Sequence, residues 1–370
     1  MTSRPDVAGP HTAFRRTYID WARGLAVLIM IEAHVLDSWT LRSERSSMLY
    51  GYLNLVGGFA APLFLWLAGL SLVLAAERAY VRSGNRAVAG KALARRGAEI
   101  FVLAFLFRAQ AFIVSPGNPL VSLLRVDILN IMGPAMVATA LLWWASGRQA
   151  VALVTCGIAA SLIALVTPIV RTAAWLPYVP AAVQWYISPA GNHSTFTLFP
   201  WAGFVFAGAA AGVLLASADQ RREGAMLLRL AIAGGVIAAG SYAASYQPSI
   251  YEASSFWTTS PTYFGVRAGA MMVALAGLYT LGPLAARLPS ASGVLARLGR
   301  HSLFIYWIHV ELVYGYATLF LHHRLPIWLN AVAYIAMCFF LYGALGVRDV
   351  VVGWWTARRA GRPGPETLAA

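Results

Sequence analysis

The first apolar stretch of the chain carries ionisable side chains at a spacing that suits acid–base chemistry. It reads YIDWARGLAVLIMIEAHVLDSW and contains Asp20, Arg23, Glu32, His34 and Asp37. At about 100° per residue, all of these except Glu32 fall within one arc of about 100° on a helix, and Glu32 falls on the opposite side. Because charged groups are costly against lipid, we expect this stripe to face a cavity inside a helical bundle.

His34 is the candidate base of the stripe. It follows Arg23 by eleven residues, which is roughly 16 Å along a helix. Asp37, three residues further on, is expected to orient the imidazole, and a histidine beside a carboxylate is a tunable acid–base group. For Asp20 and Arg23, an ion pair near the helix end explains the charges equally well.

Further polar groups interrupt later apolar runs. Arg108 lies within FVLAFLFRAQAFIV, Arg267 lies within PTYFGVRAGAMM, and LLRVDILNIMG contains Arg125, Asp127 and Asn130. A hydrogen bond between helices explains Asn130 alone. Three arginines at similar depth instead predict a cavity that suits an anionic or polar ligand.

Two more histidines are candidates. In LGRHSLFIYWIHVELVYG, Ser302, Tyr306 and His309 share a helix face at steps of four and three residues, and packing alone explains Ser302. His193 precedes an expected helix start. A loop histidine is more often a solvated bystander, so His193 is a secondary candidate. In the helix that follows, we interpret Gly203, Gly208 and Gly212 as packing residues.

The composition explains where these groups lie. The chain has 370 residues, of which 59% are hydrophobic and 11% charged, whereas soluble domains have about 25% charged residues. It is therefore predicted to be an all-α polytopic membrane protein. The net charge of +14 is assigned to loops that meet lipid headgroups rather than to nucleic acid. The two cysteines match neither a disulfide framework nor a metal site, and we expect no removable signal peptide.

The apolar runs predict a bundle of about ten transmembrane helices. By the positive-inside rule, we expect both termini to be cytoplasmic. Residues 1–17 form the expected N-terminal arm, 18–347 the membrane domain, and 348–370 an interfacial stretch and cytoplasmic tail. The ten expected spans lie near residues 18–38, 52–76, 97–115, 122–145, 150–170, 197–217, 226–246, 263–286, 301–321 and 326–347.

Five segments in order resemble a known family. They are YIDWARGLAVLIMIEAHVLDSW, GGFAAPLFLWLAGLSL, VDILNIMG, TLFPWAGFVFAGAAAG and LGRHSLFIYWIHVELVYG. Together they resemble bacterial members of the heparan-alpha-glucosaminide N-acetyltransferase family, which is related to the acyltransferase-3 membrane proteins. The resemblance implies a multi-pass enzyme of the bacterial inner membrane. Such an enzyme takes an acyl group from cytoplasmic acetyl-CoA, or another acyl-CoA, and delivers it to an amine or hydroxyl acceptor on the outer side.

The resemblance and the polar residues together give a candidate site without a metal. His34 best matches the family's histidine, and His309 lies in a motif shared by the wider group. The expected catalytic residues are His34, Asp37, Tyr306 and His309; those expected to bind acyl-CoA are Arg23, Arg108, Arg125 and Arg267; those expected to bind the acceptor are Asp127, Asn130 and His193.

Several alternatives stay open from the sequence. A polytopic transporter of a polar or anionic solute would also bury polar residues, although no related halves are evident. A third hypothesis is that the chain is a non-catalytic subunit of a membrane complex. The sequence leaves open whether the acceptor is a glycan, a lipid or another small molecule, whether transfer passes through an acyl-histidine, and whether the chain forms a homo-oligomer.

Overall fold

The structure is a computed structural model that describes residues 15–114, 117 and 119–360. Within these residues it is all-helical, with fourteen α-helices, short 3-10 turns and no strand. The helices are α1 (Thr17–Trp39), α2 (Met48–Gly57), α3 (Ala60–Ser83), α4 (Arg86–Val114), α5 (Ile128–Ala145), α6 (Gln149–Arg171), α7 (Ala181–Ile187), α8 (Leu198–Ala216), α9 (Glu223–Ala244), α10 (Pro261–Thr280), α11 (Gly282–Arg287), α12 (Pro289–Arg300), α13 (Ser302–Tyr314) and α14 (Ile327–Ala360).

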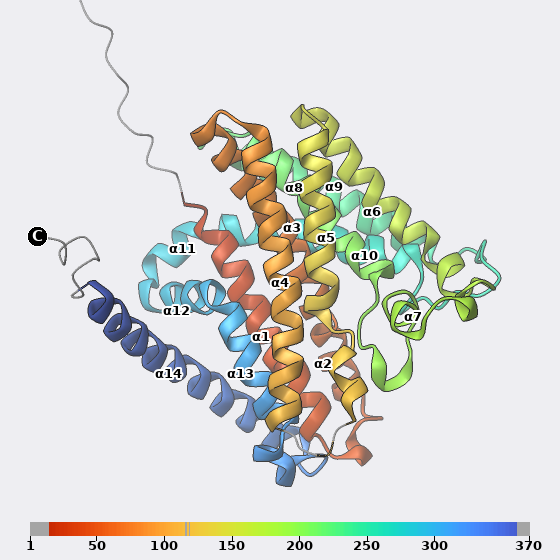
Figure 1. The fold of residues 1–370 in the computed structure, drawn as a ribbon, viewed down its shortest axis with the longest axis vertical. Helices are drawn as coiled ribbons and strands as arrows, with labels where there is room; N and C mark the ends of the chain where they lie inside the picture. Colours follow the sequence, from red (N-terminus) through yellow and green to blue (C-terminus); the bar gives the residue numbers. More distant parts are fainter. Residues whose placement is uncertain (1–14, 115–116, 118, 361–370) are drawn as a thin grey trace, which may run out of the picture.

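The long helices form one bundle around α3 and α8 (Figure 1). In an apolar stretch of 18 residues, about two thirds of the residues are buried in the α2–α3 segment and in α8, against 17% in α9 and in α14. The outer helices therefore offer their apolar side chains to lipid. In Figure 1, α14 runs obliquely along one side of the bundle, and α11 and α12 lie beside the start of α1.

The chain is a multi-pass membrane protein. Among the described residues, seven helices are long and apolar enough to cross a bilayer, with α2 and α3 counted as one segment, Met48–Ser83. They correspond to seven of the ten expected spans. The other three expected spans fall on α1, α10 and α13. The ionisable residues of α1 keep it outside the apolar set, and the 13 residues of α13 reach only about 20 Å. The count of ten and the side on which the termini lie stay predictions.

The structure corrects several expected boundaries. Residues 77–96, which lie between the expected spans 52–76 and 97–115, are almost wholly helical, because α3 continues to Ser83 and α4 already begins at Arg86. The expected span 263–286 ends at Thr280, and residues 289–300 form the separate helix α12. Helix α14 continues unbroken past residue 347 to Ala360.

Local sequence signals explain where key helices begin and end. Asp127 caps α5: its side chain accepts a hydrogen bond from the Ile128 amide at 3.1 Å, and Asn130 accepts one from the Asp127 amide at 2.9 Å. Gly84 ends α3 with φ +64°, a left-handed conformation that glycine adopts without strain. Ser260 and Pro261 start α10. These signals hold Asp127 and the lower part of α10 at one end of the bundle.

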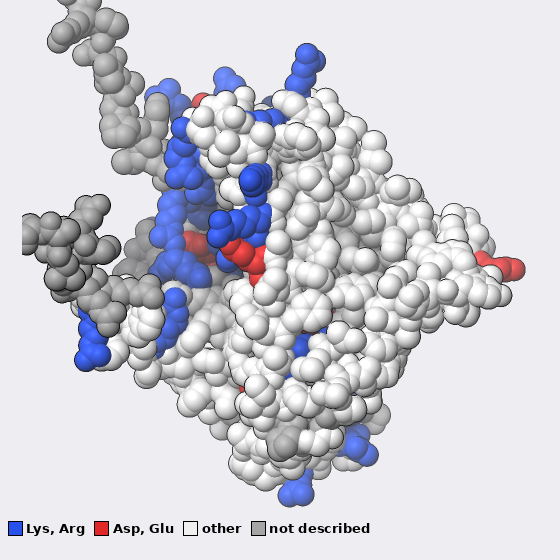
Figure 2. Space-filling model, in the orientation of Figure 1, with Lys and Arg blue, Asp and Glu red and all other residues white. Residues whose placement is uncertain are grey.

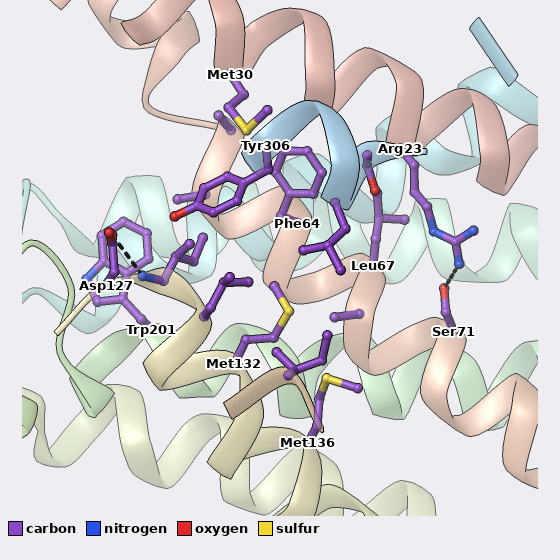
Figure 3. Close-up of a pocket in the computed structure, with 18 of the residues that line it drawn as sticks. Arg23, Met30, Phe64, Leu67, Ser71, Asp127, Met132, Met136, Trp201 and Tyr306 are labelled. Atoms are coloured by element: carbon purple, nitrogen blue, oxygen red, sulfur yellow. Dashed lines mark hydrogen bonds between the residues drawn. The ribbon is translucent and has the colours of Figure 1, made fainter. Parts of the chain in front are cut away.

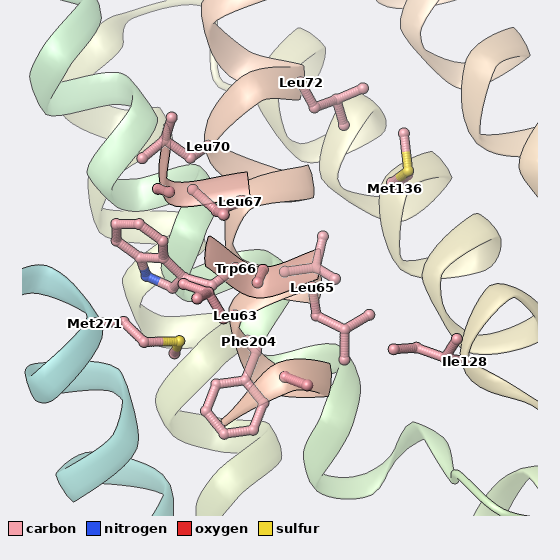
Figure 4. Packing of buried hydrophobic residues seen from close by; sticks show 14 of the residues in the cluster. Leu63, Leu65, Trp66, Leu67, Leu70, Leu72, Ile128, Met136, Phe204 and Met271 are labelled. Carbon is pink, nitrogen blue, oxygen red and sulfur yellow. The ribbon is translucent and has the colours of Figure 1, made fainter. Parts of the chain in front are cut away.

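The core lies where α3 meets its neighbours (Figure 4). Trp66 of α3 is fully buried and packs into one apolar cluster with Phe204 of α8 and Met271 of α10. The helices α3 and α8 approach closely because glycines face the partner backbone. A β-carbon at Gly208 would lie 1.8 Å from the carbonyl oxygen of Trp66, and one at Gly212 would lie 2.7 Å from that of Leu70. The interpretation of these two glycines as packing residues is confirmed.

Gly208→Ala is expected to destabilise the protein, because the added methyl group must push α3 and α8 apart. Overpacking of this kind costs about 1–3 kcal/mol. The measurement is the midpoint of thermal unfolding in detergent. Gly157→Ala on α6 is the matched control, since a β-carbon there meets nothing within 4 Å. Equal unfolding midpoints for the two variants would contradict the close approach.

Candidate functional site

A single cavity of about 1780 Å³ runs through the described part of the bundle. Its lining includes Arg16 and Arg82 near the start of α1 and the α3–α4 turn, and Arg125 and Trp257 at the opposite end. We call the first end the basic end and the second the far end. Because one cavity reaches both, a molecule bound at the basic end and a molecule bound at the far end can meet inside it.

The charged stripe of α1 faces this cavity, as its spacing predicts. Asp20, Arg23, His34 and Asp37 all line it. Glu32 does not; its carboxylate lies beside Gly57 of α2, and neither oxygen has a hydrogen-bond partner among the described residues. The prediction that the stripe looks inward, with Glu32 on the other side, is confirmed.

The basic end gathers positive charge around a hollow, which Figure 2 shows with blue arginine side chains around a few red carboxylates. Asp20 holds two of the arginines in place, with Arg15 at 2.7 Å and Arg23 at 3.1 Å. Arg23 also donates to the Ser71 hydroxyl. The arginines that line the cavity here are Arg15, Arg16, Arg23, Arg78, Arg82 and Arg96, and the carboxylates are Asp20 and Glu77. The excess of cations suits a polyanionic ligand.

Apolar side chains line the middle of the cavity (Figure 3), and we call this part the neck. Met30, Phe64, Leu67, Met132 and Met136 point into it, between the Arg23–Ser71 pair and Asp127. Methionine side chains are flexible and adapt to irregular shapes. The neck therefore suits an extended, mostly apolar chain between two polar compartments.

Just beyond the neck, His34 of α1 is joined to His309 of α13. His34 Nδ1 lies 2.7 Å from His309 Nε2, and the ring planes are within 8° of each other. His309 is fully buried, and its Nδ1 lies 2.9 Å from the carbonyl oxygen of Ile305. His34 lines the cavity, whereas His309 does not.

The second hydrogen bond fixes the protons of both rings. A carbonyl oxygen only accepts, so His309 Nδ1 carries a proton and its Nε2 has the free lone pair. His34 Nδ1 must then donate to that lone pair. In the neutral pair His34 Nε2 then carries no proton, and its lone pair, unlike that of His309 Nε2, is not used within the pair; it lies on the ring that borders the cavity.

Asp37 does not orient His34, contrary to the expectation from their spacing. Its carboxylate accepts a hydrogen bond from the Tyr314 hydroxyl at 3.0 Å and lies 3.7 Å from Arg45. The side chain of Asp37 is 58% exposed, because it lies three residues closer than His34 to the end of α1 at the far end. His309 occupies the orienting position instead.

Tyr306 lies on the cavity wall beside the histidine pair, as expected from its face of α13. Its ring meets the His309 ring edge-on at 5.9 Å. Arg108 also lines the cavity and forms an ion pair with Asp127 across α4 and α5. Both partners are largely buried, with 13% and 14% of their side chains exposed.

Arg125 and Arg267 reach the same part of the cavity. Arg125 donates to the Thr195 hydroxyl at 2.8 Å. Arg267 is 9% exposed, donates to the Tyr263 hydroxyl and stacks on its ring at 4.1 Å. The cavity thus brings together the arginines expected at depth, but places them at the far end, beyond the neck from Arg23.

Two expected ligand-binding residues do not line the cavity. Asn130 is fully buried, and its side-chain oxygen caps α5. His193 stacks on Trp185 at 4.5 Å in the connection between α6 and α8. Asn130 and His193 therefore do not border this cavity, and their assignment to the acceptor stays a prediction. The described residues contain no cluster of three or more groups that suits a metal ion.

Some lining residues were not identified from the sequence. Glu311 and Tyr314 follow His309 by two and five residues in the same quoted motif and face the cavity. Their position in that motif was the available signal. Ser71, Trp201 and the methionines of the neck carry no distinguishing pattern, since each is an ordinary residue of an apolar helix.

Comparison with known proteins adds one match. The family model for the catalytic region of heparan-alpha-glucosaminide N-acetyltransferase matches residues 15–250. This range covers most of the cavity-lining helices, including α1, α3, α4 and α5, and confirms the resemblance found in the sequence. No curated protein sequence matches the chain.

Asp127→Asn is expected to lower stability by about 3 kcal/mol, because it leaves the Arg108 cation buried without its partner. Asparagine keeps the helix cap, so the change isolates the charge. Thermal unfolding in detergent measures the effect, and Arg108→Gln with Asp127→Asn is expected to cost less than the sum of the single changes. The control is Glu99→Gln, which breaks exposed pairs with Arg95 and Arg96. Additive effects would contradict a coupled pair.

Proposed function

The chain belongs to the heparan-alpha-glucosaminide N-acetyltransferase family, and on that premise we propose that it transfers an acetyl group from acetyl-CoA at the basic end of the cavity to an amine or hydroxyl acceptor at the far end. Family membership makes it a membrane acetyltransferase. The donor, the class of acceptor and the direction of transfer are the proposal.

One observation carries the proposal. His34 borders a cavity that reaches both ends of the bundle, and its hydrogen bond to His309 leaves Nε2 free to accept a proton. A base placed between two compartments can serve a donor that enters from one and an acceptor that enters from the other.

The basic end is the proposed site for the phosphates of acetyl-CoA. Arginine pairs well with phosphate because its planar fork donates two parallel hydrogen bonds. Six arginines and two carboxylates line this end, so the local charge favours a polyanion. The pantetheine arm would then extend through the apolar neck and bring the thioester towards His34.

The chemistry of the step follows from the histidine pair. His34 Nε2 removes a proton from the acceptor as its nitrogen or oxygen attacks the thioester carbonyl carbon. The carbon–sulfur bond breaks, the acetyl group stays on the acceptor, and the proton passes to the CoA thiolate. His309 holds the His34 tautomer and shares the positive charge that develops on it.

Charge also develops on the thioester oxygen during attack. The Tyr306 hydroxyl and the Arg108 guanidinium both border the cavity beside the histidine pair and are the proposed donors to this oxygen. Donors that are already in place cost no reorganisation in the transition state, which is why such contacts accelerate acyl transfer.

The side of the membrane and the class of acceptor belong to the same proposal. We place the basic end on the cytoplasmic side of a bacterial inner membrane, in accord with the positive-inside rule. The acceptor, a sugar or glycan above all, enters from the outer side. Lipids surround the exposed faces of α9 and α14.

A transporter of a polar or anionic solute is the second candidate, because a cavity that reaches both ends would also serve transport. Release of free CoA separates the two: an enzyme cleaves the thioester, whereas a carrier leaves it intact.

His34→Ala is expected to lower CoA release from acetyl-CoA by at least about 100-fold, as for loss of a general base. His309→Leu should also be slow, and His309→Gln should recover part of the rate because the glutamine oxygen can accept from His34 Nδ1. A thiol reagent measures the rates on purified protein.

Size-exclusion profiles and thermal unfolding control for folding of these variants. Full activity in folded His34→Ala would remove the assignment of the base. Equal rates for His309→Leu and His309→Gln would contradict the orienting role of His309.

Arg96→Gln is expected to raise the KM for acetyl-CoA about two- to fivefold with little change in kcat, as an exposed ion pair contributes roughly 0.5–1 kcal/mol. Its neighbour Arg95 is the matched control, because both residues contact Glu99 but only Arg96 lines the cavity. Steady-state kinetics at two salt concentrations measures the effect. Identical KM values for Arg95→Gln and Arg96→Gln would argue against donor binding at this end.

A further inference from the structure

Arg267 is a buried cation at the far end without a carboxylate partner. Only 9% of the residue is exposed, and none of the described residues forms an ion pair with it. Its contacts are the Tyr263 hydroxyl and the rings of Tyr263, at 4.1 Å, and Phe59, at 5.7 Å. Its Nε is buried and donates to no described group. A buried charge of this kind is costly unless something compensates it.

The local structure makes room for the guanidinium. A β-carbon at Gly58 would lie 2.8 Å from Arg267 Nη2, so a side chain there would have to displace it. The preceding residue, Gly57, lies against Ala33, the neighbour of His34 on α1. The α2–α3 junction therefore holds Arg267 close to the segment of α1 that carries the proposed base, and both Arg267 and His34 line the cavity.

Two carboxylates of the far end are used elsewhere. Asp127 pairs with Arg108, and Asp37 contacts Tyr314 and Arg45. Glu311 lines the cavity from α13, the helix that carries His309. Arg125 donates to the neutral Thr195 hydroxyl and forms no ion pair with a described residue. No described carboxylate forms an ion pair with Arg267, and its position borders the cavity.

We propose that Arg267, with Tyr263 and Trp257 as its wall, forms an anion-binding subsite that selects acceptors carrying a carboxylate, phosphate or sulfate group. Trp257 lines the cavity, and its ring lies 5.1 Å from that of Tyr263, which gives an acceptor an aromatic surface beside the charge. This inference rests on the proposed acetyl transfer and names the class of acceptor for it.

The residues of the subsite lie outside the part of the chain that the family model matches. The family match ends at residue 250, whereas Trp257, Tyr263 and Arg267 all follow it. Arg267 is also separated from the proposed donor site, because the neck lies between Arg267 and the arginines of the basic end. An anionic group on the acceptor and the phosphates of CoA would therefore occupy different compartments.

The test compares matched amino sugars as acceptors: glucosamine, its 6-phosphate, its 6-sulfate and the corresponding uronic acid. The wild-type protein is expected to use at least one anionic sugar with a kcat/KM about tenfold or more above that of glucosamine, as for a hydrogen-bonded charge pair. The phosphate, sulfate and carboxylate arms identify the anion. Arg267→Gln should lower kcat/KM for the anionic sugars about tenfold more than for glucosamine, and Arg267→Lys should keep part of the preference.

Arg42→Gln is the matched control, because Arg42 is an exposed arginine near the end of α1 and does not line the cavity. Equal use of glucosamine and all anionic sugars, or an unchanged preference in Arg267→Gln, would overturn the subsite. Binding of the sugars without acetyl-CoA, followed by tryptophan fluorescence with Trp257→Phe as reference, supplies a second readout. If no sugar releases CoA, the proposed function fails; Arg267-dependent binding of anionic sugars would still support the subsite, and its absence would overturn it.

Discussion

The structure depends on one constraint, which is that ionisable side chains inside an apolar bundle must reach water, a partner or a ligand. The stripe on α1 meets this constraint by facing a cavity, where Asp20 holds Arg23 and His34 is held by His309. The glycines between α3 and α8 let these two helices pack closely in the core. The remaining helices can then leave a hollow beside it without losing the core.

The cavity is continuous, and the chemical character of its lining changes along its length. Arginines surround the basic end, methionines and leucine form the neck, and the far end mixes arginines, carboxylates and aromatic rings. This order matches the order of parts in an acyl-CoA: phosphates, a flexible arm and a reactive thioester. The histidine pair lies where the neck opens to the far end, so a thioester that has passed the neck would meet the base and the acceptor together.

Patterns within one helix were predictable from the sequence, and contacts between distant helices were not. The 3.6-residue repeat placed Asp20, Arg23 and His34 on one face, and the spacing of Gly208 and Gly212 predicted close packing; the structure confirms both. The bond between His34 and His309 joins residues 275 positions apart, and no periodicity carries that information.

Local reasoning also failed where tertiary contacts compete for a side chain. Asp37 was expected to orient His34 because it is close in sequence, yet Tyr314 and Arg45 hold it. The side-chain oxygen of Asn130 caps α5, so a helix start accounts for a polar residue within this apolar run. The basic segment 77–96 is helical because α3 and α4 extend beyond their apolar parts, and hydropathy alone marks only the apolar part of a helix.

In the proposed reaction, acetyl donor and acceptor approach one base from opposite ends of a single cavity. The direct measurement uses vesicles with the purified protein in one orientation, acetyl-labelled CoA on the side of the basic end and acceptor on the other side. We expect labelled product to form on the acceptor side while free CoA stays with the donor, and His34→Ala to stop both. Product that forms only when donor and acceptor share a side, or intact acetyl-CoA that crosses the membrane, would contradict it.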